Sequence, residues 1–404
     1  MKHTCIDLFC GVGGLTLGFE SANIETLFAN DFDSEIANSY KKNFPKVPFY
    51  GGDITLLDYQ KISKECNLSI GDIDVIMGGP PCQGYSMANR KRIESDERNL
   101  LFLEFVKCVE YFKPKCFLIE NVVGMKEENI YHDNENKSVV NTIRDYFNNL
   151  DNVKYKIGFR VFKSEEHGVP QYRRRIILIG TRLENKKKAL EFGEIGHLLP
   201  THKSLEEIRI VKKTYQNQIS LLDNKHYKNM TNKKEPTTVW DAISDLPDIG
   251  AGEGQTVMDY DSSPKNDYQK LMRRDSEHVL NHQSTPHSDK AIKRIKLIEQ
   301  GQNFRNLPKE LQTKSVHSGA YGRLETDNLS PTVTTRFDTP STGRVIHPIR
   351  HRTLTVREAA RIQSFPDKHQ FLGSRTSQGK QVGNAVPPLV AKEIANMFIR
   401  DLLD

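Results

Sequence analysis

The chain has 404 residues, of which 37% are hydrophobic and 27% charged, and a formal net charge of +6. This length predicts one large domain and a smaller one, and the composition predicts a globular protein with a packed interior. The charge is compatible with a polyanionic partner, but many proteins without such a partner share it. No secretory signal or membrane-spanning apolar run is visible, which argues against export and membrane insertion. Six cysteines without paired short spacings indicate reduced thiols rather than a zinc cage, so we expect a cytoplasmic protein.

Short apolar runs alternate with amphipathic stretches through the first half of the chain. Each run ends near Gly, Asn, Asp or Glu, and this alternation is typical of an α/β fold with a mostly parallel sheet. The predicted strands are CIDLF (5–9), ETLFAN (25–30), DVIMGG (74–79), CFLIEN (116–121) and RIILIG (175–180). A crossover helix is predicted where apolar residues recur at helical spacing before Pro114. Those residues are Leu100, Leu101, Phe105, Val106, Val109 and Phe112.

A glycine-rich turn follows the first predicted strand in DLFCGVGG (7–14), and Leu15, Leu17 and Phe19 open a helix behind it. Glycines there let a ligand approach the backbone amides at the helix N-terminus. Thr16 stands where the dinucleotide-binding fingerprint has its third glycine, so a nicotinamide cofactor is disfavoured. A glycine-rich turn can also be an ordinary loop.

Acidic side chains follow the strand predicted at 25–30 and a further presumed strand that ends at Gly52. Asp31 comes after the second strand, where a carboxylate can accept hydrogen bonds from ribose hydroxyls, and Phe32 beside it can stack on adenine. Asp53 and Ile54 offer a second carboxylate and an apolar wall for the adenine ring. The ordinary role of an Asp after a strand is to cap a helix, and that alternative stays open.

The segment GGPPCQGYS (78–86) ends the strand predicted at 74–79. Its Gly and Pro pairs predict a rigid turn that presents Cys82 at the carboxyl edge of the sheet, where open α/β sheets bind ligands. A free cysteine is more often buried packing than a nucleophile. The Pro-Pro turn favours the nucleophile at this position.

The composition becomes lysine-rich and polar after Gly180, and we place a domain boundary there. Few long apolar runs occur before about residue 345, yet Leu, Ile and Tyr are spaced through the region. We therefore expect a folded second lobe with long surface loops rather than disorder.

Two helices with an apolar period of three to four are predicted at 356–365 and 389–403. Around the first of them, Arg352, Glu358 and Arg361 recur at helical or near-helical spacing. This pattern favours a salt-bridged scaffold helix that braces the second lobe, made of exposed charge pairs rather than reacting groups.

Six segments in a fixed order carry a family pattern. They are DLFCGVGG (7–14), GGPPCQGYS (78–86), ENV (120–122), QYRRR (171–175), RTLTVREAARIQSFP (352–366) and QVGNAV (381–386). These segments resemble the motifs of the DNA (cytosine-5)-methyltransferases of the bacterial, restriction-modification type. The resemblance covers about residues 4–185 and 330–400. It implies a Rossmann-like S-adenosylmethionine-dependent methyltransferase domain with a mostly parallel sheet, plus a smaller DNA target-recognition domain.

The resemblance also implies domain boundaries and a cofactor. The expected parts are a catalytic and cofactor-binding domain at 1–184, a target-recognition domain at 185–349, a hinge or scaffold segment at 350–375, and a C-terminal part at 376–404 that completes the catalytic domain. The implied cofactor is S-adenosylmethionine, with S-adenosylhomocysteine as product and no metal. The implied cofactor-binding residues are Phe9, Gly11, Gly13, Gly14, Leu15, Asp31, Phe32, Asp53, Ile54, Pro80, Asn384 and Val386.

Four catalytic residues are implied in the same way. Cytosine C5 is a poor nucleophile until a thiolate adds at C6, and Cys82 matches that thiolate. Glu120 is suited to protonate N3 from a poorly solvated pocket, unless it is a solvated carboxylate at a strand end. Arg173 and Arg175 alternate on an extended segment, so both can bind the base O2 or a phosphate and lower the pKa of the thiol. The alternative for the arginines is a charged edge strand that resists aggregation.

A cytosine stacked in a duplex must be flipped out before C6 can be attacked, so the second lobe is expected to hold the DNA meanwhile. Its lysines and arginines include phosphate contacts, although most lysines there are solvated surface. The implied DNA-binding residues are Gln83, Ser86 and Arg336. We expect a monomer associated with the nucleoid of a prokaryote, acting on double-stranded DNA, with a cognate restriction endonuclease as a candidate partner.

Two other functions stay open at this point. A transfer RNA cytosine-5 methyltransferase of the same fold is disfavoured by the long lobe between the QYRRR and RTLTVRE segments, because a reader of duplex sequence needs that bulk. A catalytically silent DNA-binding protein would keep the fold without needing all four implied catalytic residues.

Overall fold

A computed structural model of the chain describes residues 2–81, 101–126, 129–132, 135–184, 200–204, 233–313 and 317–403. Cys82, Gln83, Ser86 and Leu100, which were singled out above, lie outside the described residues. The chain divides into two compact units. Unit 1 comprises residues 1–163, 174–198 and 391–404, and unit 2 comprises residues 164–173 and 199–390. The segment 376–404, predicted to complete the catalytic domain, is thus shared between the units, and the functional roles of the predicted domains stay predictions.

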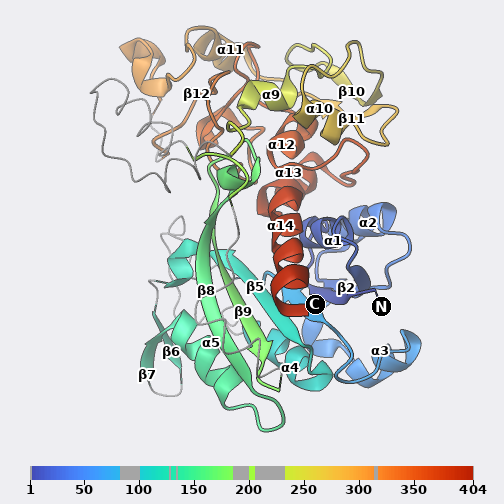
Figure 1. The fold of residues 1–404 in the computed structure, drawn as a ribbon. Coiled ribbons are helices and arrows are strands. Elements are labelled where there is room, and N and C mark those ends of the chain that lie inside the picture. Colours follow the sequence, from blue (N-terminus) through green and yellow to red (C-terminus); the bar gives the residue numbers. More distant parts are fainter. Residues whose placement is uncertain are drawn as a thin grey trace, which may run out of the picture. The chain divides into compact units, whose positions relative to one another are not determined.

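Unit 1 is built on a seven-stranded sheet with the order β3-β2-β1-β4-β5-β9-β8. Its strands are β1 (Thr4–Leu8), β2 (Glu25–Asp31), β3 (Phe49–Gly51), β4 (Val75–Gly78), β5 (Cys116–Val122), β8 (Tyr155–Lys163) and β9 (Arg174–Arg182). The first five run parallel to one another, whereas β9 pairs antiparallel with both β5 and β8 (Figure 1). All five predicted strands and the mostly parallel α/β sheet are confirmed.

The helices of unit 1 lie between these strands. They are α1 (Gly14–Glu20), α2 (Ser34–Asn43), α3 (Tyr59–Glu65), α4 (Phe102–Phe112) and α5 (Val139–Asn148), with a 3-10 turn η1 (Ile54–Leu56) after β3 and a hairpin of β6 (Asn129–His132) and β7 (Glu135–Ser138) before α5. The predicted crossover helix is α4, in which Phe105, Val109 and Phe112 are fully buried. It ends at Lys113, which has a φ of 49°, directly before Pro114.

The main core of unit 1 depends on one close approach between β9 and β5. A Cβ added at Gly180 would lie 2.0 Å from the ring of Phe117. That ring stacks on Phe147 of α5, with ring centroids 4.1 Å apart. Gly180 therefore leaves the space that the aromatic stack occupies.

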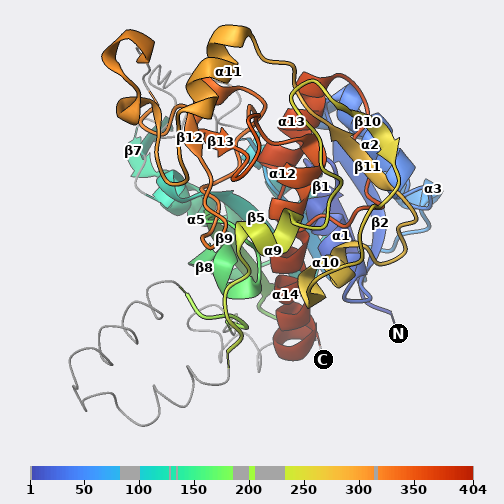
Figure 2. The ribbon, with the colours of Figure 1, turned by 90° about the horizontal axis from the view of Figure 1, so that it is seen from above.

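Residues from distant parts of the sequence meet in unit 1 where α14 (Pro388–Phe398) runs beside α1 (Figures 1 and 2). A Cβ added at Gly18 would lie 2.3 Å from Cβ of Ala391. The next residue, Phe19, packs against Phe398 with ring centroids 6.1 Å apart. The second predicted C-terminal helix is thus confirmed, and its unit 1 portion packs on α1.

Unit 2 holds the short elements of the second lobe and the segment after it. Its helices are α9 (Val239–Ile243), α10 (Asp267–Met272), α11 (Asp289–Lys296), α12 (Val356–Ile362) and α13 (Arg375–Asn384). Its strands are β10 (Gly254–Met258), β11 (Val279–Gln283), β12 (Gly322–Arg323) and β13 (Arg344–Ile346). The first two pair antiparallel and the last two parallel. Among the helices of the described ranges, none is long and apolar enough to cross a membrane.

Arginine–carboxylate pairs form the interior of unit 2 around α12. The guanidinium of Arg352 donates two hydrogen bonds of 2.8 Å to the carboxylate of Glu358. Arg361 donates to Asp245 at 2.7 Å and to Asp367 at 2.6 Å. All five side chains are at most 2% exposed. The predicted salt bridges are confirmed, but the expectation that these charges are exposed is wrong, because all seven residues of α12 are buried.

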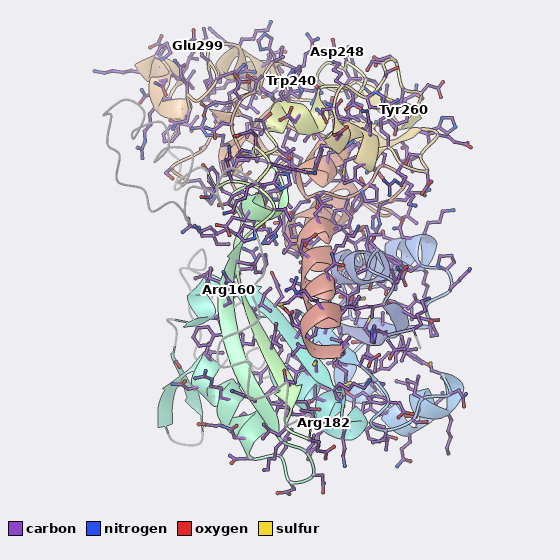
Figure 3. All side chains as sticks on the ribbon, viewed as in Figure 1. Arg160, Arg182, Trp240, Asp248, Tyr260 and Glu299 are labelled. Atoms are coloured by element: carbon purple, nitrogen blue, oxygen red, sulfur yellow. The ribbon has the colours of Figure 1, made fainter. Side chains whose placement is uncertain are left out.

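Tyr260, labelled in Figure 3, extends this interior toward the surface of unit 2. Its hydroxyl donates to Asp367 at 2.6 Å, and its ring lies 3.5 Å from the guanidinium carbon of Arg273. Arg273 in turn donates to Asp245 at 3.2 Å. Each buried carboxylate therefore has more than one donor, as buried charges require.

Candidate active site

The predicted glycine-rich turn follows β1 and reaches α1 through left-handed backbone conformations. Gly13 has a φ of 86°, and a Cβ there would lie 2.3 Å from the ring of Phe44. Phe9 has a φ of 54°, which is costly for a residue with a side chain. Cys10 N–H donates to the carbonyl of Asn30 at 3.0 Å. These features hold the loop against the carboxyl end of β2.

Asp31 ties the loop to β2. Its Oδ2 accepts from Gly11 N–H at 2.8 Å, and its Oδ1 accepts from Asp33 N–H at 3.0 Å. Burial raises the pKa of Asp31, although these backbone donors oppose the shift. A carboxylate has about four lone-pair sites, so Asp31 keeps acceptor capacity for ligand hydroxyls beyond its structural bonds.

Open space adjoins this part of the sheet edge in unit 1. A Cβ added at Gly11 or Gly52 would meet no atom of the described residues within 4 Å. Gly52 N–H donates to the Asp31 carbonyl at 3.0 Å, so the ends of β2 and β3 are joined. Phe32, the next residue, is 77% exposed. An exposed aromatic ring, spare carboxylate oxygens and two glycines facing open space suit a nucleoside such as the adenosine half of S-adenosylmethionine.

Asp53 and Ile54 in the turn after β3 both take part in the fold of unit 1. Asp53 uses Oδ1 to cap η1, accepting from Thr55 N–H at 2.9 Å, which is the helix-capping alternative. Ile54 is only 4% exposed and belongs to the main core. The exposed apolar side chain of this turn is Leu56, at 81%, which the sequence analysis did not single out.

A buried polar cluster beneath the loop was also missed. Oδ2 of Asp7 accepts from the hydroxyl of Thr16 at 2.6 Å and from its N–H at 3.2 Å. The Thr16 hydroxyl also lies 2.8 Å from the Tyr40 hydroxyl on α2. Oδ1 of Asp7 has no hydrogen-bond partner in the part of the chain that the structure describes, and burial raises the pKa of Asp7 to about 7, against the effect of Thr16. Thr16 instead of glycine was the available signal, because a hydroxyl at that position needs a partner.

The segment from Gly78 to Pro80 leaves β4 alongside the end of β5. Gly78 has no room for a side chain, since a Cβ there would lie 2.4 Å from the Leu8 carbonyl oxygen. A Cβ at Gly79 would lie 3.4 Å from Oε2 of Glu120. The side-chain amide of Asn121 donates to the carbonyl of Pro80 at 3.0 Å. The chain that leads to residue 82 is therefore fixed beside the ENV segment.

Glu120 and Arg175 meet across the β5–β9 pair. Glu120 is only 8% exposed, so its side chain is not a solvated carboxylate at a strand end. Its Oε1 lies 3.1 Å from Nε of Arg175, within ion-pair distance. Because β9 lies between β5 and β8, Arg175 is not on an edge strand, and the aggregation-resisting alternative is wrong for it.

Arg173 has different partners from Arg175. It is almost fully buried in unit 2, where its guanidinium donates to the Gly383 carbonyl at 3.1 Å and the Asn384 carbonyl at 3.4 Å. Arg174 between the two arginines is exposed, so the predicted alternation is present. The structure brings Arg175 to Glu120 and Arg173 to the QVGNAV segment.

Three further predicted residues lie in unit 2. The side chain of Asn384 is exposed at the end of α13, whereas Val386 is buried. The exposed Arg336 has its Nε 3.4 Å from Asp338 and donates to the Thr339 hydroxyl at 2.9 Å. Its partners leave part of the guanidinium facing solvent.

Four cysteines of unit 1 are poor nucleophiles. Burial raises the pKa of Cys116 to about 12, and it raises the pKa values of Cys5, Cys10 and Cys108 well above the ordinary thiol value. A thiol that stays protonated neither attacks carbon nor binds a metal readily. Cys66, partly exposed, is the other described free thiol. In the part of the chain that the structure describes, no group of three His, Cys, Asp or Glu side chains could hold a metal ion.

Comparison with known proteins identifies the family of the chain. A family model described as C-5 cytosine-specific DNA methylase matches residues 3–400. The Type II methyltransferase M.DdeI of Desulfomicrobium norvegicum is 34% identical, with 96% of this chain and 87% of the relative covered. The Type II methyltransferase M1.HphI of Haemophilus parahaemolyticus is 31% identical, with 99% and 87% covered. A solved structure of a DNA modification methyltransferase encoded within an E. coli prophage has a TM-score of 0.71 at 25% identity, with 100% of both chains covered. The chain therefore belongs to the C-5 cytosine-specific DNA methylase family and is a DNA (cytosine-5)-methyltransferase.

Proposed function

We propose that this enzyme methylates C5 of one flipped-out cytosine in a specific double-stranded DNA sequence, through a covalent bond between Cys82 and C6. The observation that carries the proposal is the position of Gly79 and Pro80, whose contacts with Glu120 and Asn121 hold the start of the catalytic loop beside a buried acid. Cys82 follows two residues after Pro80. The high pKa values of the four buried thiols also favour Cys82 as the nucleophile.

The proposed reaction begins when the Cys82 thiolate forms a bond to C6 and the C5–C6 electron pair shifts toward N3. Glu120 donates a proton to N3, which prevents negative charge from building up on the ring. Arg175, 3.1 Å from Glu120, holds that side chain in place and supplies a donor for the base O2. S-adenosylmethionine supplies the methyl group that C5 accepts. A base then removes the C5 proton, the Cys82–C6 bond breaks as the C5–C6 double bond forms again, and Glu120 recovers its proton from N3.

The cofactor site that we propose lies at the carboxyl ends of β1, β2 and β3. Backbone amides of Gly11, Gly13 and Gly14 approach the ligand, Asp31 and Asp53 accept hydrogen bonds, and the exposed ring of Phe32 stacks on the base. The remaining cofactor-binding residues in the proposal are Phe9, Leu15, Ile54, Pro80, Asn384 and Val386. For Arg173 we propose a positioning role, since its guanidinium is bound to the carbonyls of residues 383 and 384.

The proposed DNA-binding part is the region 185–349, with segment 350–375 as its scaffold. Arg336 contributes a partly exposed guanidinium, and we propose Gln83 and Ser86 as contacts from the catalytic loop. Because the named relatives are Type II methyltransferases, we propose that the enzyme protects DNA in a restriction-modification system with a cognate endonuclease. We further propose a monomer at the nucleoid, because each catalytic event modifies one strand.

A covalent trap tests this mechanism. Randomised duplex DNA containing 5-fluorocytosine should form a denaturation-resistant adduct with the enzyme and S-adenosylmethionine, because fluorine at C5 blocks the final elimination. Peptide mass spectrometry should place the adduct on Cys82. Cys82→Ala should abolish both the adduct and methylation of ordinary duplex, whereas the matched variant Cys66→Ala should retain both. Adduct formation or methylation that survives Cys82→Ala would contradict the mechanism.

A further inference from the structure

Two fully buried glutamines of unit 2 form a chain of amide hydrogen bonds. The Nε2 of Gln171 donates to Oε1 of Gln363 at 2.7 Å. The Oε1 of Gln171 accepts from Val333 N–H at 2.7 Å. Three segments far apart in sequence therefore share one polar contact inside the unit, and each amide is satisfied on both its oxygen and its nitrogen side.

The chain continues from Gln363 to the end of α13. Its Nε2 donates to the Val382 carbonyl at 2.8 Å and lies 3.5 Å from the Ala385 carbonyl. The last carbonyls of a helix have no partner within the helix and need one from elsewhere. Gln363 and Arg173 provide those partners, since Arg173 binds the carbonyls of Gly383 and Asn384.

Close backbone packing fixes the same helix end from another side. A Cβ added at Gly383 would lie 2.6 Å from the backbone of Thr334 and Thr335. One turn earlier, a Cβ at Gly379 would lie 2.6 Å from the Thr335 carbonyl oxygen. The end of α13 is therefore held by side-chain donors and also by direct backbone contact, so a lost donor shifts the segment that follows rather than the whole helix.

We infer that Gln363, bound to Gln171, is a positioning residue for cofactor binding. It sets the backbone of residues 382–385, and through that backbone the exposed side chain of Asn384. This inference rests on the proposed function, in which Asn384 and Val386 contact the cofactor. Neither glutamine touches substrate in this assignment, and both act through the carbonyls that they bind.

The first test compares Gln363→Leu with the wild-type enzyme. Calorimetric titration with S-adenosylhomocysteine should show a Kd raised about tenfold, because the end of α13 loses its donor. In methylation of genomic DNA, the KM for S-adenosylmethionine should rise by a similar factor, and kcat should stay within about threefold. A purely structural role would instead lower the active fraction and kcat without changing KM.

The matched control is Gln269→Leu, because Gln269 is another fully buried glutamine of unit 2. Its Nε2 donates to the Asp241 carbonyl and the Ser244 hydroxyl, both at 2.9 Å, and not to the end of α13. This variant should lower the melting temperature about as much as Gln363→Leu and leave the Kd within twofold. Equal loss of affinity in both variants would overturn the inference.

A second variant keeps the test decisive if Gln363→Leu does not fold. Gln363→Glu retains an acceptor for Gln171 but loses the donor to Val382, so its affinity for S-adenosylhomocysteine should fall by a similar factor. Unchanged affinity in a folded Gln363→Glu enzyme would overturn the inference while leaving the proposed function intact. Failure of the wild-type enzyme to bind S-adenosylhomocysteine would instead overturn the proposed function.

Discussion

Removing the guanidinium of Arg352 should be among the most destabilising single changes in unit 2. Arg352→Met leaves the carboxylate of Glu358 in a site that is 2% exposed, with Nε2 of His347 3.6 Å away as its nearest remaining cation candidate. The same change removes the donors to the carbonyls of Ile249 and Thr353. Breaking a buried ion pair from one side costs about 3–5 kcal/mol, so we expect a loss of that size in the free energy of unfolding.

The pH dependence adds an independent check. Burial alone would raise the pKa of Glu358, but Arg352 and His347 outweigh that effect and hold the pKa well below its ordinary value of 4.5. A lowered carboxyl pKa stabilises the folded state fully above the unfolded value, and this stabilisation is lost as the pH falls toward the folded value. In Arg352→Met, burial raises the pKa of Glu358 above 4.5 instead, so the difference in stability between wild-type and Arg352→Met should be greatest at high pH and should shrink as the pH falls, beginning above pH 4.5.

Urea unfolding followed by circular dichroism measures both effects. The double variant Arg352→Met with Glu358→Met should be more stable than Arg352→Met alone, because no charge is left buried, although it also loses the Glu358 cap on Thr355 N–H. Two results would refute the reasoning: a loss below about 1 kcal/mol for the single variant, or a double variant whose loss equals the sum of the two single losses.

Three further predictions concern unit 1. Asn121→Ala removes the amide that holds Pro80, so kcat for methylation of genomic DNA should fall about 10- to 100-fold while the Kd for S-adenosylhomocysteine stays within about twofold; unchanged kcat would count against the anchoring role. Gly11→Ala places a methyl group in the open space beside the loop at a φ of +55°, so calorimetry should show affinity for S-adenosylhomocysteine reduced about tenfold or more, and equal affinity would exclude a ligand there. The pKa of Asp7 is raised by burial to about 7, so its contribution to stability is full below pH 3.8 and lost as the pH rises through 7, by up to about 4 kcal/mol; Asp7→Asn should remove that slope from urea-unfolding data, and a slope that persists would place it on other groups.

Strands β1, β4 and β5 could be predicted because they are buried on both faces and therefore read as continuous apolar runs. The edge strand β8 (Tyr155–Lys163) could not, since YKIGFRVFK mixes charged and apolar residues and most of its side chains are only partly buried. The family resemblance was confirmed because its six segments are contiguous motifs. Their order along the chain is visible without knowing the fold.

The sequence could not predict which charged side chains are buried or which residues they pair with. Arg361 and Glu358 have the spacing of charges on a surface helix. No nearby sequence signal indicates that Asp245, 116 residues away, pairs with Arg361. Likewise Arg173 and Arg175 alternate as predicted, but their partners lie in segments that only the fold brings close. Alternation determines which side of a strand a residue occupies, whereas the partner depends on long-range topology.

The packing of α14 on α1 has a consequence for how the protein is made. During synthesis, β1 and α1 leave the ribosome early. The surface of α1 at Gly18 and Phe19 stays uncovered until Ala391 and Phe398 have been translated. Closing a loop of this length is slow, so the Rossmann-like unit 1 of the nascent chain stays incomplete during that time. Chaperone dependence in cells should therefore fall in a circular permutant that encodes 391–403 directly ahead of β1.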